Sequence, residues 1–135
     1  MPTDKQGRTP TVVVADDDPR ILALAALILS SRYEVIAQVA DGEALVETVS
    51  RLKPDAAVVD IGMPGLNGIQ AVRRLKASSP VAVVYLTGQG ESALIEEALA
   101  AGGLGYVLKV SASEDLIPAV EAALAGKRFL SPSLK

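Results

Sequence analysis

Hydrophobic positions along the chain alternate between short runs rich in valine and alanine and longer stretches of helical length. The short runs predict strands over Thr11 to Ala15, Tyr33 to Val39, Asp55 to Val59, Val81 to Leu86 and Leu104 to Leu108. A helix is predicted after each strand, over Pro19 to Ser30, Gly42 to Leu52, Asn67 to Ala77, Gly90 to Ala100 and Ser113 to Ala125. This alternation indicates an α/β fold in which helices cover both faces of a parallel sheet.

Proline and capping residues support these limits. Pro19 suits the first turn of a helix, and Pro54 blocks continuation of the helix before it. Ser111 and Glu114 have the spacing of a capping box before the last helix, and Pro118 then falls in or just past its first turn. We expect residues 1–10 to be disordered, residues 11–126 to form one domain and residues 127–135 to begin a linker.

Acidic residues stand directly after two of the predicted strands. Asp16, Asp17 and Asp18 follow the first strand, and Asp60 follows the third. The carboxyl ends of parallel strands lie where open α/β sheets bind ligands, so these acids are expected to converge. Two unit charges about 4 Å apart repel by roughly 4 kcal/mol at an effective dielectric near 20, which favours a bound cation. Taken alone, an acidic run before a helix is as often an N-cap, and Asp18 is best interpreted as one.

Two further polar residues, Thr87 and Lys109, follow the fourth and fifth strands at the same edge. Oxygen ligands beside a phosphoryl group suit Mg²⁺ better than Ca²⁺ or Zn²⁺. An aspartate carboxylate can attack phosphorus, and a hydroxyl and an ammonium group can then stabilise the added oxygens. The edge therefore favours phosphoryl chemistry.

Composition excludes several classes of function. The 135 residues include no cysteine and no histidine, so the chain offers no thiolate or imidazole for metal binding or catalysis. A net charge of -3 gives no basic surface, so direct nucleic acid binding is not expected. The longest apolar stretch, Ile21 to Leu29, is far shorter than the roughly 20 residues that span a bilayer, and we expect a cytoplasmic protein without membrane contact. The same stretch predicts exposed apolar surface, a candidate contact for a dimer or an output domain.

These motifs together resemble those of two-component response regulator receivers. The resemblance rests on Val12-Val13-Val14-Ala15-Asp16-Asp17-Asp18-Pro19, Asp60-Ile61-Gly62-Met63-Pro64-Gly65-Leu66-Asn67-Gly68, Thr87 and Gly105-Tyr106-Val107-Leu108-Lys109. It covers nearly the whole chain and implies that residues 11–126 are a receiver domain. The implied fold is a doubly wound, five-stranded parallel sheet with the flavodoxin-like strand order 2-1-3-4-5 and helices on both faces.

The resemblance also implies a role for each site residue. Asp60 would accept phosphate from a sensor histidine kinase, and Mg²⁺ would be held by Asp17, Asp60 and the Gly62 carbonyl, with Asp16 in support through water. Thr87 and Lys109 would contact the phosphoryl oxygens. Such a receiver is not a conventional enzyme, because its own chemistry is weak self-phosphorylation from small donors and autodephosphorylation.

Other positions concern switching and the lifetime of the phosphate. Tyr106 would be the aromatic residue whose rotamer follows activation, although without the family pattern a half-buried packing role is favoured. Gly62 and Gln89 occupy positions that vary among receivers and that lie where water would approach the acyl phosphate. Val110 departs from the pattern, since many receivers have proline there. A cis peptide bond between Lys109 and Val110 is therefore less expected.

Two segments resemble the NarL/FixJ branch of the family, in which a LuxR-type helix-turn-helix follows the receiver. They are Tyr33 to Gly42 and Ala125 to Pro132. This resemblance implies a LuxR-type DNA-binding output domain in a longer protein. A homodimer that forms on phosphorylation is a further expected partner.

Two alternatives stay open from the sequence. A phosphatase resembling the haloacid dehalogenase-like enzymes would use Asp16 and Asp18 as its D-x-D pair, but it leaves Asp60 without a role. A phosphorylation-independent interaction module is disfavoured by the intact set of acids, Thr87 and Lys109.

Overall fold

The structure of the protein is a computed structural model, and it describes residues 8–134. Within these residues one sheet contains β1 (Thr11–Ala15), β2 (Glu34–Val39), β3 (Ala56–Val59), β4 (Ala82–Thr87), β5 (Gly105–Leu108) and β6 (Phe129–Leu130). The helices are α1 (Pro19–Leu29), α2 (Gly42–Leu52), α3 (Gly68–Lys76), α4 (Ser92–Ala100) and α5 (Ala112–Leu124). Short 3-10 turns span Lys109–Ser111 and Pro132–Leu134. Every predicted strand and helix is therefore present, with ends that shift by at most two residues.

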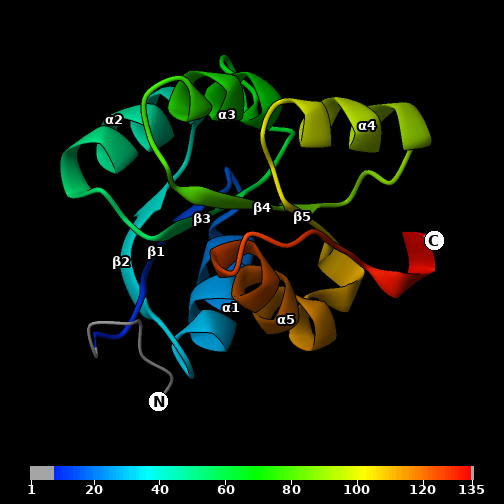
Figure 1. Ribbon diagram of the computed structural model, residues 1–135, viewed down its shortest axis with the longest axis horizontal. Coiled ribbons are helices and arrows are strands. Elements are labelled where there is room, and N and C mark those ends of the chain that lie inside the picture. The colour runs from blue at the N-terminus through cyan, green and yellow to red at the C-terminus, as the bar shows by residue number, and fades with distance from the viewer. Residues whose placement is uncertain (1–7, 135) are drawn as a thin grey trace.

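The sheet lies between two layers of helices (Figure 1). Helices α2, α3 and α4 cover one face, and α1 and α5 cover the other. Successive side chains of β1 point to opposite faces of the sheet, so the hydrophobic core has two parts. Val13 packs with the first layer of helices, and Val12 and Val14 pack with the second. Both faces of the central strands are buried, so these strands need no polar positions. The α/β architecture expected from the hydrophobic pattern is confirmed.

The expected number of strands is wrong. The sheet order is β2-β1-β3-β4-β5-β6 with all neighbours parallel, so the predicted order holds but a sixth strand follows β5. Phe129 N donates to Leu104 O, and Ser131 N donates to Tyr106 O, both at 3.0 Å. A strand of two residues is too short to show a period of two, so the hydrophobic pattern gave no signal for it. Part of the expected linker thus belongs to the sheet.

Helix α5 begins differently from the prediction. Asp18 does cap α1, since its carboxylate accepts a hydrogen bond from Arg20 N at 2.9 Å. Ser111, however, makes no capping hydrogen bond, and the predicted capping box with Glu114 is wrong. Ser111 closes the preceding 3-10 turn with φ -106° and ψ 10°, whereas an N-cap residue is normally extended.

The N-terminal segment is described only from residue 8 onward. Most of the segment expected to be disordered, residues 1–7, lies outside the described residues. Pro10 is buried, and its carbonyl accepts a hydrogen bond from Glu34 N at 3.0 Å. None of the described helices has the length and apolar character needed to cross a membrane.

Candidate functional site

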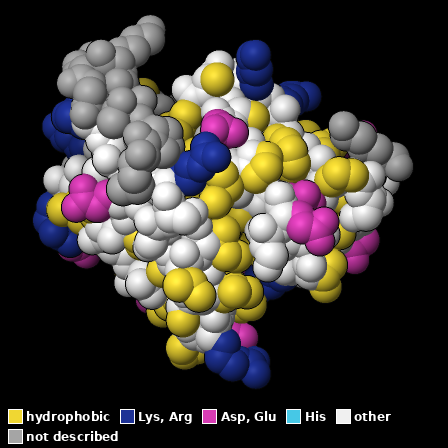
Figure 2. All heavy atoms as spheres, turned by 90° about the horizontal axis from the view of Figure 1, so that it is seen from below, with side chains coloured by type: hydrophobic (Ala, Val, Ile, Leu, Met, Phe, Trp, Pro, Cys, Tyr) yellow, Lys and Arg dark blue, Asp and Glu magenta, His cyan; other side chains and the backbone are white. Residues whose placement is uncertain are grey.

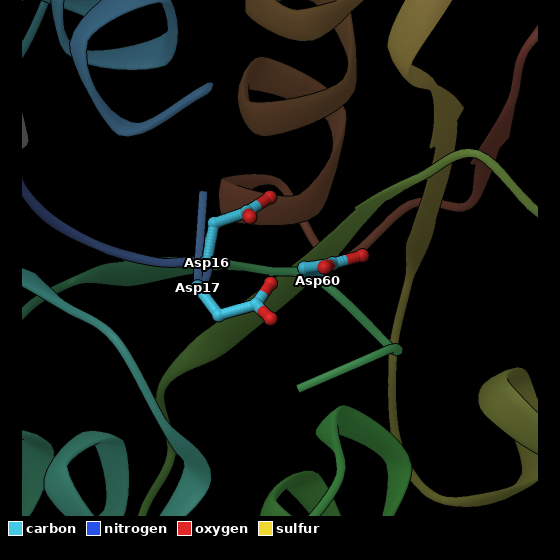
Figure 3. A group of neighbouring side chains, drawn as sticks. All are labelled: Asp16, Asp17 and Asp60. Atoms are coloured by element: carbon cyan, nitrogen blue, oxygen red, sulfur yellow. The ribbon is translucent and has the colours of Figure 1, made fainter. Parts of the chain in front are cut away.

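Three carboxylates converge where β1 and β3 end, at one edge of the sheet. Asp16 and Asp17 follow β1, and Asp60 follows β3 (Figure 3). One oxygen from each lies within 4.8 Å of the others. The two strands are direct neighbours, and Asp60 N donates to Ala15 O at 2.9 Å, so pairing of the main chain brings the acids together. Asp16 and Asp60 are buried, whereas Asp17 is exposed. The predicted convergence of the acids is present.

Lys109 brings a positive charge to this cluster. Its Nζ lies 3.1 Å from Asp16 Oδ2 and 3.4 Å from Asp60 Oδ2. Because β4 lies between β3 and β5, the lysine side chain reaches past the end of β4 to meet both acids. Burial disfavours the ammonium form, but the two carboxylates outweigh it and raise the pKa of Lys109. The side chain is therefore charged at neutral pH.

Asp16 is the most constrained of the three acids. Burial raises its pKa, the Asp18 N–H bonded at 2.8 Å and the Lys109 ammonium partly offset this rise, and the charge of Asp60 adds to it. Apart from the ion pair with Lys109, no donor among the described residues hydrogen-bonds to the buried Asp16 Oδ2. One ammonium against three carboxylates leaves the cluster negative. A hard cation that accepts carboxylate oxygens and keeps water ligands, such as Mg²⁺, fits this set.

Thr87 and Gly62 lie on the segments that flank Asp60. Thr87 is the last residue of β4, the strand between those that precede Asp60 and Lys109, and it is fully buried. Its hydroxyl accepts a hydrogen bond from Gln89 N at 3.3 Å. A Cβ built on Gly62 would lie 3.9 Å from Asp60 Oδ2 and 3.5 Å from Gln89 Nε2. Gly62 and Gln89 are therefore close to each other beside the Asp60 carboxylate.

Tyr106 is turned fully into the protein. Its side chain is buried, and its hydroxyl donates to Gln89 O at 2.6 Å. The ring centroid lies 6.0 Å from that of Tyr85. Burial raises the pKa of Tyr106 to about 12, with smaller contributions from the charges of Glu91 and Asp60. Tyr106 is therefore more deeply buried than the half-buried packing role expected from the sequence, and its hydroxyl is hydrogen-bonded to the loop that follows Thr87.

Three other residues differ in their relation to the site. Asp18 caps α1 and pairs with Arg20 at 3.0 Å, and its carboxylate is not one of the three clustered acids. Val110 is 92% exposed, and the peptide that joins it to Lys109 is trans. The sequence pattern does not identify Ser131 as a residue near the site. Ser131 is fully buried, and its hydroxyl accepts a hydrogen bond from Leu108 N at 3.1 Å. Its one sequence signal is a polar residue directly after the apolar pair that forms β6.

Comparisons with known proteins agree with this geometry. The family model described as the response regulator receiver domain matches residues 12–121. The chain is 33% identical over 131 residues to the transcriptional regulatory protein PdtaR of Mycobacterium tuberculosis, covering 96% of this chain and 64% of the relative. It is 33% identical over 126 residues to the transcriptional regulatory protein DesR of Bacillus subtilis, covering 92% and 63%. The chain thus spans less than two thirds of the length of these curated relatives.

Among solved structures, the fold is similar to that of a LuxR-family two-component response regulator from Aurantimonas sp. SI85-9A1. The TM-score is 0.86 at 32% sequence identity, and the alignment covers 93% of this chain and 92% of the other.

Proposed function

Since the chain belongs to the response regulator receiver domain family, we propose that Asp60 accepts a phosphoryl group from a sensor histidine kinase. The chain is a receiver domain of the two-component type, similar to receivers of LuxR-type transcriptional regulators. One observation carries the assignment of Asp60. Asp60 and Asp16 are both buried beside the Lys109 ammonium within the group of three acids, but of these two only the Asp60 carboxylate lies within 4 Å of a Cβ built on Gly62, beside the loop that carries Gln89.

The cation belongs to this proposal. Asp17, Asp60 and the Gly62 carbonyl would hold Mg²⁺, with Asp16 in support through water. Bound Mg²⁺ would neutralise negative charge on the phosphoryl oxygens. The fit rests on the negative cluster and on the buried Asp16 Oδ2, whose only close cation among the described residues is Lys109.

Phosphoryl transfer needs positioning more than acid–base chemistry. A carboxylate oxygen of Asp60 attacks phosphorus, the bond from phosphorus to the donor histidine nitrogen breaks, and its electron pair returns to the imidazole. The Lys109 ammonium pairs with a phosphoryl oxygen, and the Thr87 hydroxyl donates to another. Weak self-phosphorylation from small donors and autodephosphorylation use the same residues.

Asp60→Asn tests the assignment, and Asp18→Asn is its matched control. Asparagine keeps a capping oxygen at position 18, so this variant retains the start of α1 and all the proposed site residues. After incubation with acetyl phosphate and Mg²⁺, intact mass should show one added phosphoryl group in the wild type and in Asp18→Asn, and none in Asp60→Asn. An undiminished acyl phosphate in Asp60→Asn would refute the assignment.

The same variants address the two alternatives. Turnover of a phosphomonoester that survives Asp60→Asn but is lost in Asp16→Asn would favour the phosphatase. Failure of the wild type to bind Mg²⁺ and beryllofluoride would favour an interaction module that works without phosphorylation.

The output of the receiver is also a proposal. Phosphorylation would draw Thr87 toward the phosphoryl group, and the inward position of Tyr106 would follow that state. A LuxR-type DNA-binding domain after residues 127–135, in a cytoplasmic regulator, would respond to the switch.

A homodimer that forms on phosphorylation is supported by exposed apolar surface on α1. Leu27 is 75% exposed and Leu24 is 39% exposed. Figure 2 looks onto the layer of α1 and α5 and shows hydrophobic side chains gathered in a broken band on this face. Sedimentation of the wild type and of Leu27→Glu, each with and without beryllofluoride, tests this contact. Self-association that glutamate leaves unchanged would remove α1 from the interface.

A further inference from the structure

The C-terminal segment, residues 129–134, is hydrogen-bonded to β5, the strand that leads to Lys109. Ser131 N donates to Tyr106 O at 3.0 Å, and the Ser131 hydroxyl accepts a hydrogen bond from Leu108 N at 3.1 Å. The second bond holds the main chain one residue before Lys109. Ser131 is fully buried, so water does not compete for this bond.

The Ser131 side chain takes the place of a main-chain acceptor. In a longer parallel strand, a β6 carbonyl would receive the Leu108 N–H. Here Pro132 begins a 3-10 turn, and the Ser131 carbonyl instead accepts a hydrogen bond from Leu134 N at 2.8 Å. Without the hydroxyl, the Leu108 N–H would lose its acceptor at the covered edge of β5.

A second contact connects the C-terminal segment with the loop after β4. A Cβ built on Gly90 would lie 3.2 Å from Leu134 Cδ2, so Leu134 packs closely over this loop. The same loop carries Gln89, whose carbonyl accepts the Tyr106 hydroxyl. Leu134 also packs against the core cluster that contains Tyr106. The C-terminal segment therefore contacts both the Lys109 strand and the loop that follows Thr87.

We propose that Ser131 is a positioning residue for Lys109, acting through the Leu108 amide. The position of the C-terminal segment then affects the rate at which Asp60 is phosphorylated, because a small displacement of a group that positions the reacting atoms slows the reaction. The inference rests on the proposed function and adds a role for residues outside the cluster of acids.

Ser131→Ala tests the proposal, with Ser133→Ala as a matched control. Ser133 is exposed in the same segment, so its hydroxyl can be removed without uncovering a buried group. The rate of Asp60 phosphorylation by acetyl phosphate with Mg²⁺ should fall about fivefold in Ser131→Ala, as expected for loss of one hydrogen bond. Ser133→Ala should keep the wild-type rate.

A double-mutant cycle separates positioning from a general loss of structure. If Ser131 acts through Lys109, Ser131→Ala should slow phosphorylation no further in a Lys109→Ala background. Amide exchange measured by NMR should show faster exchange at Leu108 in Ser131→Ala, with the central strands unchanged. A fivefold loss that persists in the Lys109→Ala background would overturn the proposal, because Ser131 would then act by another route.

Leu134→Ala is a second variant that keeps the Ser131 hydroxyl and every fully buried residue of the core, because Leu134 itself is only partly buried. It should loosen the seating and slow phosphorylation, again only when Lys109 is present. The failure of each proposal is distinguishable. If the wild type takes up no phosphoryl group, the proposed function fails. If the wild type is phosphorylated and both Ser131→Ala and Leu134→Ala match its rate, the inference alone fails.

Discussion

Replacing Gly68 by alanine presses a methyl group against the main chain that carries Asp60. A Cβ at Gly68 would lie 2.2 Å from Asp60 O and 2.8 Å from Ile61 Cα, whereas ordinary van der Waals contact begins at 3.4 Å. Both atoms belong to the main chain, so no flexible side chain can move aside. Gly68 N also donates to Ile61 O at 3.0 Å, which resists withdrawal of α3.

The difference between the Gly68 distances and an ordinary van der Waals contact determines how large the effects on stability and on rate should be. Relief requires the Asp60 carbonyl or the start of α3 to move by about 1 Å, and overpacking of this kind costs about 1–3 kcal/mol of stability. A displacement of about 1 Å between a nucleophile and its partners can cost on the order of 10²-fold in rate. We therefore expect Gly68→Ala to lower the free energy of unfolding and to slow phosphorylation by acetyl phosphate much more than its stability loss explains.

Gly65→Ala is the matched control for Gly68→Ala. Gly65 has φ +70° and nothing within 4 Å of a built Cβ, so alanine there adds backbone strain of about 1–2 kcal/mol without pressing on Asp60. Urea unfolding measures the stability of both variants, and intact mass against time measures the phosphorylation rate. If Gly68→Ala is phosphorylated as fast as Gly65→Ala, the close approach of α3 does not set the position of Asp60.

Three further outcomes are expected. Asp16→Asn should raise the melting temperature and weaken Mg²⁺ binding, since it removes a buried charge whose pKa burial raises; an unchanged or lower melting temperature would count against this reasoning. Asn67→Ala should cost about 1 kcal/mol in urea unfolding, because it removes one side of the capping box at α3, and a cost near zero would contradict that role. Burial raises the pKa of Tyr106 from its ordinary value of 10.0 to about 12, so its contribution to stability is complete below pH 10 and is lost as the pH rises toward 12. Ultraviolet titration should then show phenol ionisation together with unfolding, and full ionisation of a folded chain near pH 10 would be the contrary result.

Much of the candidate site could be predicted because it depends on where strands end. Asp16 and Asp17 follow one apolar run and Asp60 follows another, and in a parallel sheet all carboxyl ends lie at one edge. Burial could not be predicted in the same way. Asp16 and Asp17 are adjacent in the chain, yet the first is 1% exposed and the second is open to solvent, because β1 ends at Ala15 and the chain bends at Asp17.

The sequence by itself determined the succession of strands and helices and the positions of the acids, because hydrophobic periodicity and strand ends are local properties of the chain. The tertiary structure decided which distant groups meet. Lys109 reaches two acids from other strands, and Ser131 bonds to Leu108, which is 23 residues away. The strand ends place Lys109 at the same edge as the acids, but its distances to the two acids depend on strand order, and the Ser131 contact depends also on the turn that begins at Pro132. The acids of the site were therefore predictable, whereas the connection of the C-terminal segment to Lys109 appears only in the folded chain.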